Sequence, residues 1–184
     1  MKNLVFMMDI DIKGDGRYAS SRREAYKYSI DSWKKWCDKN DCELFVLNDL
    51  IMSNDKMGIC WQRYYMFDIL EANEVEYDQV LMVDADTIVH PDCPNFFEMT
   101  ENKFCAVEFD GSWDWVLRGV ENYSKYMFDG YMMPWEQYFD AGFIIVNKNH
   151  KQFYQDIVSF YFTNQDNLIK LQETFHNGTD QTPV

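Results

Sequence analysis

The sequence lacks several features that define other classes of protein. No apolar run approaches the length of a membrane span, and the apolar residues 4–8 are too few for a signal peptide and are followed at once by Asp9 and Asp11. The chain has no internal repeat, no low-complexity segment and no convincing linker. We therefore expect residues 1–184 to form one globular domain, which is long enough to bury a large share of its unfolded surface.

Positive charge is also scarce. The sequence has 17 Lys and Arg residues against 31 Asp and Glu residues, which gives a formal net charge of −14. A surface of this kind repels nucleic acids and anionic membranes. We therefore expect no nucleic-acid partner, and a negatively charged ligand would need a cation to mediate its binding.

The cysteines do not form the pattern of a disulfide framework or of a metal site. Their number is odd, and no Cys-x-x-Cys pair is present. We interpret them as free thiols in a reducing compartment, which favours the cytoplasm, or the host cytoplasm for a viral protein. They are Cys37, Cys42, Cys60, Cys93 and Cys105.

The order of the apolar segments predicts an α/β domain with a mostly parallel central sheet flanked by helices. After the first strand, residues 21–24 have the spacing of a capping box, and apolar residues then repeat at helical spacing to about residue 38. This order of strand, loop, helix and strand is typical of a doubly wound, Rossmann-like sheet. The expected strands lie at 4–8, 43–47, 80–83, 104–109 and 139–147, and the expected helices at 21–38, 59–73 and 149–162, with a short helix after Pro94.

Two carboxylates end the most informative strand. Residues 80–83 are apolar and partly β-branched, as in a buried central strand, and Asp84 and Asp86 follow them. Residues at i and i+2 of an extended chain point to one side, so both carboxylates can face a crevice at the carboxyl end of the strand. Because close carboxylates repel each other, a hard divalent cation would stabilise them there. The alternative is that one aspartate caps a turn and the other is only solvated.

Residues 110–137 show no clear periodicity, and they place large aromatic side chains among glycines and acids. An irregular run of this length is usually a functional loop or a lid. Aromatic rings can stack against the apolar C–H face of a sugar, and the alternative is ordinary packing beneath a long loop. The rings are Trp113, Trp115, Tyr123, Tyr126, Tyr131 and Trp135.

Residues 139–147 form the second informative strand. Asp140 stands at its start, and the following Ala-Gly pair lets another part of the backbone pass closely. The chain closes on a polar cluster that contains His176 and Asp180. Because the sequence stops just after this cluster, we expect a domain trimmed from a longer chain.

Together these segments resemble those of the GT-A glycosyltransferases. Residues 80–89 are similar to the Asp-x-Asp strand of that group, and residues 139–147 to the Phe-Asn-Ala-Gly strand of family 8-like members, with Asp140 in place of the commoner Asn. The Gly-Thr-Asp-Gln run at 178–181 resembles their Asp-Gln motif, and Trp-Gln-Arg at 61–63 resembles their Trp-x-Lys/Arg segment. Order and spacing agree over nearly the whole chain, as in the N-terminal domains of large chlorella-virus glycosyltransferases.

The resemblance implies a nucleotide-sugar site with a metal ion at the carboxyl ends of the strands. The nucleotide is usually uridine diphosphate, and the metal is usually Mn²⁺, with Mg²⁺ as the alternative. Asp86 would hold the metal together with Asp84, directly or through ribose or water, and Ala85 between them would contact the nucleotide. His176 is a further candidate ligand, and the alternative is an exposed loop histidine.

Basic residues would surround the rest of the donor. The resemblance implies that the loop from Asp9 to Arg17 frames the base and the ribose. Arg63, with Lys56 as a second candidate, would approach the nucleotide or its phosphates. Such cations would stabilise the negative charge that gathers on the departing diphosphate.

Asp140 and Asp180 are the candidate catalytic residues beside the anomeric carbon. In retaining relatives, the matching positions orient the sugar or stabilise its positive charge, whereas in inverting enzymes one carboxylate removes the acceptor proton. The family 8-like strand and the Asp-Gln motif favour retention. For Asp180, the alternative is a turn residue after a Gly-Thr pair.

The predicted function is the metal-dependent transfer of a hexose or 6-deoxyhexose from a UDP-sugar to a glycan acceptor, by a domain that is a monomer. Three alternatives remain: a sugar- or nucleotide-binding module without catalysis, a plain acidic interaction domain, and a haloacid-dehalogenase-like phosphatase. The phosphatase pattern is Asp-x-Asp-x-Thr near the N-terminus. Here Thr87 follows Asp86 directly and the motif is central, which disfavours that reading.

Overall fold

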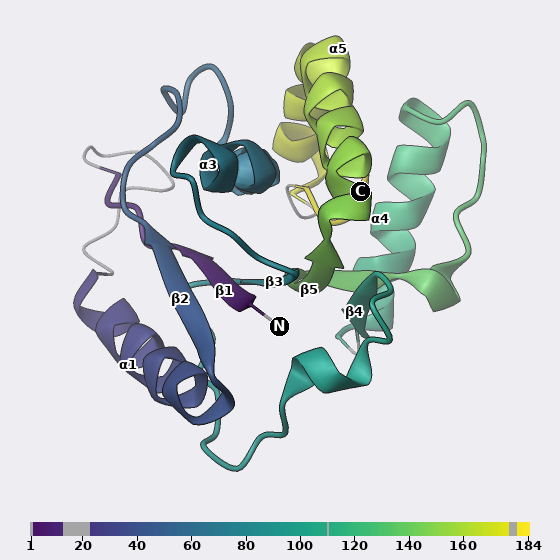
Figure 1. Ribbon diagram of the computed structural model, residues 1–184. Helices are drawn as coiled ribbons and strands as arrows, with labels where there is room; N and C mark the ends of the chain where they lie inside the picture. The colour runs from purple at the N-terminus through teal and green to yellow at the C-terminus, as the bar shows by residue number, and fades with distance from the viewer. Residues whose placement is uncertain (1, 13–22, 110, 177–179) are drawn as a thin grey trace.

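The computed structural model describes residues 2–12, 23–109, 111–176 and 180–184. They form one five-stranded sheet, in the order β2-β1-β3-β5-β4, with helices on both faces (Figure 1). The strands are β1 (Asn3–Met8), β2 (Cys42–Leu47), β3 (Gln79–Val83), β4 (Cys105–Glu108) and β5 (Phe139–Asn147). The α-helices are α1 (Arg23–Asn40), α2 (Ile59–Gln62), α3 (Met66–Ala72), α4 (Trp113–Tyr126) and α5 (Lys151–Phe175). The short 3₁₀ helices are η1 (Arg63–Tyr65), η2 (Phe96–Met99), η3 (Trp135–Gln137) and η4 (Lys148–His150).

The α/β class is confirmed, but the expectation of a mostly parallel sheet was wrong. β1 pairs in parallel with β2 and with β3, whereas β5 is antiparallel to both β3 and β4. The sheet is therefore mixed. The apolar runs of β3 and β5 indicated buried strands, but an apolar run contains no information about strand direction.

Alternate side chains of the central strands enter two separate cores. On one face, Phe6 of β1 and Met82 of β3 pack in the core that contains the side chains of α3 and α5. On the other face, Val5 and Val83 pack with Trp33 of α1. Figure 1 shows this division, with α1 on one side of the sheet and α3 and α5 on the other. The two layers hold β1 and β3 side by side at the centre of the molecule.

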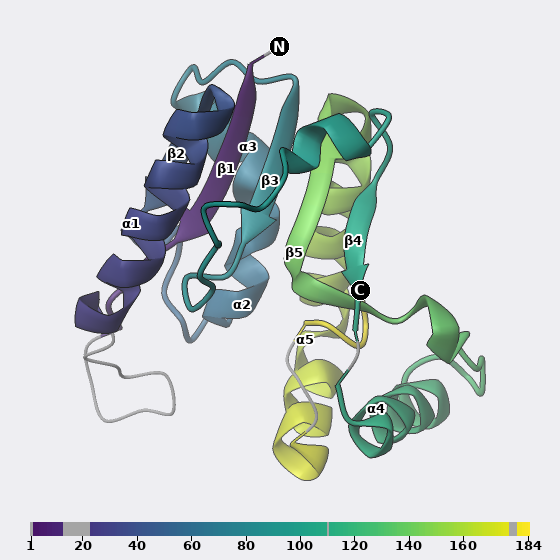
Figure 2. The same ribbon diagram turned by 90° about the horizontal axis from the view of Figure 1, so that it is seen from below.

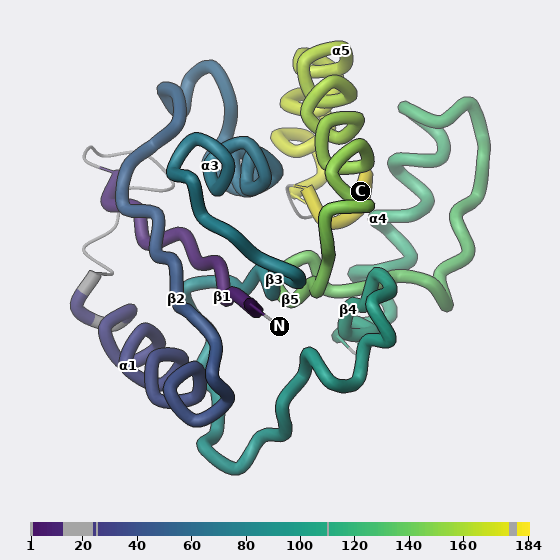
Figure 3. The backbone as a smooth tube through the Cα atoms, viewed as in Figure 1, coloured from purple at the N-terminus to yellow at the C-terminus, as the bar shows by residue number. Residues whose placement is uncertain are grey.

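The chain reverses its winding direction between β1 and β3. From β1 it passes through α1 to β2 at the edge of the sheet, and it then returns through α2, η1 and α3 to β3 on the other side of β1 (Figure 3). The two connections leave the sheet on opposite faces. Open α/β sheets bind ligands at such a reversal, beyond the carboxyl ends of the strands.

β5 contains a bulge near its start. Ala106 of β4 pairs with Ile144, but the next residue of β4 pairs with Asp140, so residues 141–143 have no partner in β4. A bulge bends a strand and changes where its side chains point. This bulge lies beside the end of β3, because β3 pairs with the other edge of β5.

Residues 113–126 form a helix, α4, where the sequence analysis expected a loop or lid. The buried side chains Val116, Val120 and Tyr123 do repeat at helical spacing. Aromatic side chains on the outer face and Gly119 in the middle obscured this repeat. In Figure 2, α4 lies beside α5 at the end of the sheet where β4 ends.

The last helix is longer than predicted. α5 continues to Phe175, because Leu168 and Leu171 pack into the core from a segment that is otherwise polar. The five cysteines are free, as predicted. No helix within the described parts of the chain is long and apolar enough to cross a membrane.

Candidate active site

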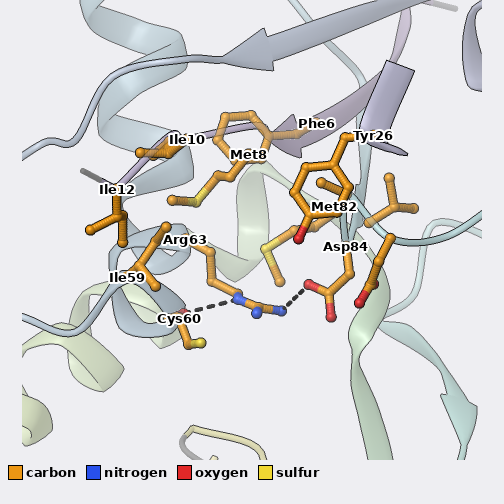
Figure 4. Close-up of a pocket in the computed structure, with 13 residues that line it drawn as sticks. Phe6, Met8, Ile10, Ile12, Tyr26, Ile59, Cys60, Arg63, Met82 and Asp84 are labelled. Atoms are coloured by element: carbon orange, nitrogen blue, oxygen red, sulfur yellow. Dashed lines mark hydrogen bonds and ion pairs between the residues drawn. The ribbon is translucent and has the colours of Figure 1, made fainter. Parts of the chain in front are cut away.

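A pocket of about 340 Å³ lies at the carboxyl ends of β1 and β3 (Figure 4). Its walls come from the ends of these two strands, the segment after β1, and the first turns of α1 and α2. Figure 4 shows Arg63 and Asp84 facing each other on one side, with Phe6 and Met8 on the other. The lining residues are Phe6, Met8, Ile10, Ile12, Tyr26, Ile59, Cys60, Arg63, Met82, Val83, Asp84, Ala85 and Asp86.

Arg63 is held in the pocket wall by contacts on two sides of its guanidinium. Nη1 lies 2.8 Å from Asp84 Oδ1 and donates to the Ala141 carbonyl at 2.9 Å. Nε donates to the Cys60 carbonyl at 2.9 Å and lies 3.4 Å from Asp180 Oδ2. Burial alone would lower the pKa of Arg63, but the two carboxylates hold that pKa well above its ordinary value. A permanent positive charge is therefore fixed at this position.

The helix predicted over residues 59–73 is interrupted at Arg63. α2 ends at Gln62, a 3₁₀ helix covers the next three residues, and α3 follows. The buried Gln62 amide donates to the carbonyls of Met52 and Met57 at 3.1 and 2.7 Å, which ties the preceding loop to the helix. Trp61 packs into the core against α5. In the Trp-Gln-Arg segment, Trp61 therefore packs in the core, Gln62 holds the preceding loop, and Arg63 places a positive charge in the pocket wall.

Asp84 lies close to three other carboxylates. Its side chain is 41% exposed. Partial burial raises the pKa of Asp84; Arg63 opposes this effect, and the carboxylates of Asp180, Asp86 and Asp140 raise the pKa further. Asp84 and Asp180 contact Arg63, and Asp86 and Asp140 lie close enough to Asp84 to raise its pKa, so the negative charges here outnumber the positive charge of Arg63.

Gly142 permits this crowding. The Asp84 N–H donates to the Gly142 carbonyl at 3.0 Å, and the Gly142 N–H donates to Asp140 Oδ1 at 2.7 Å. A Cβ atom at Gly142 would lie 2.5 Å from Asp84 Oδ2 and 3.0 Å from Asp140 Oδ1. Only glycine leaves room for both carboxylates. The Ala-Gly pair predicted the close approach of another part of the backbone, whereas the atoms that come closest at Gly142 belong to the side chains of Asp84 and Asp140.

Asp180 lies behind Arg63 and does not line the pocket. Its residue is only 3% exposed, and its Oδ2 accepts a hydrogen bond from the Tyr64 hydroxyl at 3.0 Å. Burial and the charge of Asp180 raise the pKa of Tyr64 well above its ordinary value, which keeps this hydroxyl protonated as a donor. The prediction placed Asp180 beside the sugar, whereas the structure places it against Arg63 and Tyr64.

The other predicted nucleotide contacts are only partly in place. Asp9 is buried, and its N–H donates to the Leu47 carbonyl at 2.9 Å, while the residues before and after it line the pocket. Lys56 is exposed in the loop before α2, where its carbonyl accepts from Gln165 of α5 at 2.8 Å, and it is not a lining residue. Arg17 lies outside the described residues.

His176 follows α5 in the left-handed conformation, with φ of 54°, and its side chain is exposed. It does not line the pocket. Tyr26 lines the pocket and Tyr64 bonds to Asp180, but neither was predicted as a site residue. The sequence indicated a core position for Tyr26, because this residue takes part in the helical repeat. For Tyr64, the one available signal was its position next to Arg63 in the sequence.

The protein side chains fit a divalent cation that is bound together with a diphosphate. In the described part of the chain, no group of three or more His, Cys, Asp or Glu side chains is placed to hold a metal by itself. Asp84 contacts Arg63 through Oδ1, which leaves Oδ2, and Asp86 is exposed at the pocket. Two carboxylates completed by phosphate oxygens are a common set for Mg²⁺. A cation there would also relieve the repulsion around Asp84.

Comparison with known proteins bears on the fold. No protein-family model matches the chain, and no curated protein matches it. One solved structure, a glycosyltransferase involved in the glycosylation of the major capsid of the chlorella virus PBCV-1, superposes with a TM-score of 0.58 over 88% of this chain and 66% of that chain, at 9% identity. The chain shares the fold of that structure. This confirms the resemblance in architecture that the motifs predicted.

Two further structures are of the Streptococcus pneumoniae TIGR4 glycosyltransferase GlyE, one of them in its apo form. They cover 98–99% of this chain and 42% of theirs, at 15–16% identity, with TM-scores of 0.45 and 0.46. TM-scores this low do not establish a shared fold. The chain spans about two thirds of the length of the viral protein and less than half of GlyE.

Proposed function

We propose that the protein is a metal-dependent glycosyltransferase of the GT-A type, which transfers a hexose or 6-deoxyhexose from a UDP-sugar to a glycan acceptor with retention. The observation that supports this most directly is the position of the pocket. It lies at the winding reversal of a glycosyltransferase fold, where an immobilised Arg63 faces Asp84 and Asp86. Pockets at such reversals bind nucleotides in open α/β sheets.

The two halves of the pocket suit the two halves of a nucleotide. The side formed by Phe6, Met8 and Tyr26 is largely apolar and can cover a base, whereas the opposite side carries the charged groups. Ile10 and Ile12, from the segment after β1, extend the apolar side. In this arrangement uracil would lie against β1 and the diphosphate against Arg63.

Electrostatics supports the need for a cation. Of the lining residues, Arg63 carries one positive charge and Asp84 and Asp86 carry two negative charges, with Asp140 and Asp180 close by. A diphosphate would be repelled from this site unless a divalent cation joined it. Asp86 and the Oδ2 atom of Asp84 would hold that ion, which would neutralise negative charge on the departing diphosphate.

The chain's own groups would position the leaving group and the sugar. Arg63 cannot swing away, because Asp180 and the carbonyls of Cys60 and Ala141 hold its guanidinium. A fixed donor costs no reorganisation while charge builds on the diphosphate. We assign Asp180 a positioning role, because it holds Arg63. We assign Asp140, which accepts a hydrogen bond from the Gly142 N–H beside Asp84, the role of orienting the donor sugar and stabilising its positive charge.

Calorimetric titration of uridine diphosphate into the full chain tests the donor site. We expect binding with Mn²⁺ that disappears with chelator. Asp86→Asn should weaken the metal-dependent binding about tenfold or more, because a charged ligand becomes neutral. The matched control is Asp92→Asn, which changes an exposed aspartate away from the pocket. Binding that is indifferent to metal, or equal in both variants, would contradict the proposal.

A nucleotide-sugar-binding module without catalysis is the second candidate. The observation that favours it is the burial of Asp180, which removes one of the two predicted catalytic carboxylates from the pocket. The two functions separate when UDP release from UDP-sugars is followed with and without added glycans. Metal-dependent UDP binding without any release would favour the binding module, and release stimulated by a glycan would favour the transferase.

A further inference from the structure

A second cleft, of about 310 Å³, lies at the end of β4. We call it the tryptophan cleft, because Trp113 and Trp135 stand on its walls with their ring centroids 4.5 Å apart and their planes at 76°. It is formed where β4, the first turn of α4 and η3 meet. The lining residues are Glu108, Phe109, Gly111, Trp113, Val116 and Trp135.

The two indoles are unusually exposed for such large apolar groups. Trp113 is 57% exposed and Trp135 is 46% exposed, whereas Trp33, Trp36 and Trp61 are almost fully buried. Exposed aromatic rings that line a concavity commonly mark a binding surface, since burying them against a ligand gains free energy. The pair is therefore available for a ligand.

The side chains beneath the cleft, which form its floor, are already packed against one another. Val116 and Tyr138 belong to a small core against which Phe109 and Trp115 pack. Phe109 and Tyr138 are also joined by a backbone hydrogen bond of 3.2 Å and by an edge-to-face ring contact at 5.7 Å. A supported floor means that a ligand would not have to order the site, which lowers the cost of binding.

The chemistry of the walls selects the class of ligand. None of the described residues that line the cleft is positively charged, so an anionic ligand would find no partner there. Glu108 is exposed at the rim, where its carboxylate can accept hydrogen bonds from hydroxyl groups. A neutral saccharide combines apolar C–H faces for the indoles with hydroxyl donors for Glu108.

The cleft lies at the edge of the sheet where β4 pairs with β5. In the pairing of β4 with β5, Glu108 lies opposite Phe139, and the preceding residue lies opposite Asp140. Asp140 is in turn separated from Asp84 only by the close approach at Gly142. Asp140 therefore connects the end of β4 that lines the tryptophan cleft with Asp84 of the strand-end pocket, and its own side chain lines neither cavity.

We propose that the tryptophan cleft binds a neutral saccharide and that this saccharide is the acceptor for transfer. The second part rests on the proposed glycosyltransferase function, whereas the first part does not. Trp113 and Trp135 hold the C–H faces of the sugar, and Glu108 accepts from its hydroxyls. A sugar in this cleft would lie at the end of β4, one residue beyond the residue that pairs with Asp140.

Saturation-transfer NMR with a panel of neutral methyl hexosides, 6-deoxyhexosides and pentosides tests the site on the full chain, without any donor. We expect transfer to at least one glycoside, and binding about tenfold weaker in Trp113→Ala and Trp135→Ala, since each removes an aromatic anchor. Trp135→Phe should retain part of the affinity. Glu108→Gln should weaken binding several-fold, and a methyl glucuronide should bind less well than its neutral counterpart.

The control is Tyr28→Ala, which removes an aromatic ring of similar exposure on α1. Its saccharide binding should equal that of the unchanged chain. No signal from any glycoside, or a signal that survives both tryptophan changes, would overturn the saccharide site. So would competition by uridine diphosphate, because the sugar would then occupy the strand-end pocket.

Binding of uridine diphosphate with Mn²⁺, measured on the same variants, separates this proposal from the proposed function. We expect that binding to be unchanged in Trp113→Ala and Trp135→Ala. Saccharide binding without any nucleotide binding would leave the cleft standing and contradict the transferase. Nucleotide binding without saccharide binding would contradict the saccharide site and leave the proposed donor site standing.

Discussion

The strand-end pocket and the tryptophan cleft are built in opposite ways. The pocket is built around charge, with an arginine whose side chain is only 13% exposed and a carboxylate behind it that is almost fully buried. The cleft depends on neutral rings that remain about half exposed on a helix and a short 3₁₀ helix. Buried charges require fixed partners, whereas exposed rings require only a supported floor.

This difference indicates where each region can change. The partners of Arg63 come from α2, the end of β3 (Asp84 follows its last residue), β5 and the C-terminal segment, so the pocket depends on most of the fold. The described residues that line the cleft come from β4 and the segment after it, from α4 and from η3, at one end of the sheet. Replacements in the pocket should therefore damage stability and binding together, and replacements in the cleft should change binding alone.

The largest expected effect comes from Arg63→Met. This change keeps most of the side-chain volume but leaves buried Asp180 and crowded Asp84 without a cation, which should cost about 3–5 kcal/mol in the free energy of unfolding. Urea denaturation measures this. The control Arg118→Met removes an exposed ion pair with Asp114 on α4 and should cost about 0.5 kcal/mol or less. Similar losses in both variants would mean that the pocket charges are not structurally coupled.

Gly142→Ala should have the next largest effect. Its Cβ would lie 2.5 Å from Asp84 Oδ2, so the carboxylate or β5 must move, at a cost of about 1–3 kcal/mol. The control is Gly58→Ala, where the nearest atom to the new Cβ is 3.8 Å away. Urea denaturation and titration with uridine diphosphate should both distinguish the variants. Unchanged nucleotide affinity in Gly142→Ala would show that the position of Asp84 is unimportant.

Tyr64→Phe should have a smaller effect. It deletes the hydroxyl that donates to Asp180 and leaves one oxygen of a buried carboxylate less well satisfied, at a cost of about 1–2 kcal/mol. Tyr154→Phe is the control, because that equally buried hydroxyl donates, within the described part of the chain, to the Met82 sulfur at 4.0 Å and to no oxygen or nitrogen. Thermal or urea unfolding compares them. Equal losses would contradict a specific role for the hydrogen bond to Asp180.

Trp113→Ala should have the smallest effect on stability, no more than about 1 kcal/mol, because the ring is more than half exposed and loses chiefly its contact with Trp135. Urea denaturation of this variant beside Arg63→Met tests the comparison directly. A loss as large as that of Arg63→Met would show that the cleft is part of the core and not a free binding surface.

Much of the fold could be predicted from the sequence. The apolar runs of β1, β3 and β5 were recognisable because these strands are buried on both faces. The helical repeat of α1 was recognisable because burial of one helix face imposes a period of 3.6 residues. The antiparallel direction of β5 was not, since a strand buried on both faces reads the same in either direction. α4 was missed because aromatic side chains on its outer face masked the spacing of Val116, Val120 and Tyr123.

The sequence by itself determined which chemical groups are present and roughly where they stand. It placed Asp84 and Asp86 at a strand end and a glycine where two segments meet, because short-range backbone geometry decides such features. Only the tertiary structure decided that Asp180, far along the chain, would lie behind Arg63, and that Trp113 and Trp135 would form a cleft. Contacts between distant residues depend on how the layers pack, and no local pattern contains that information.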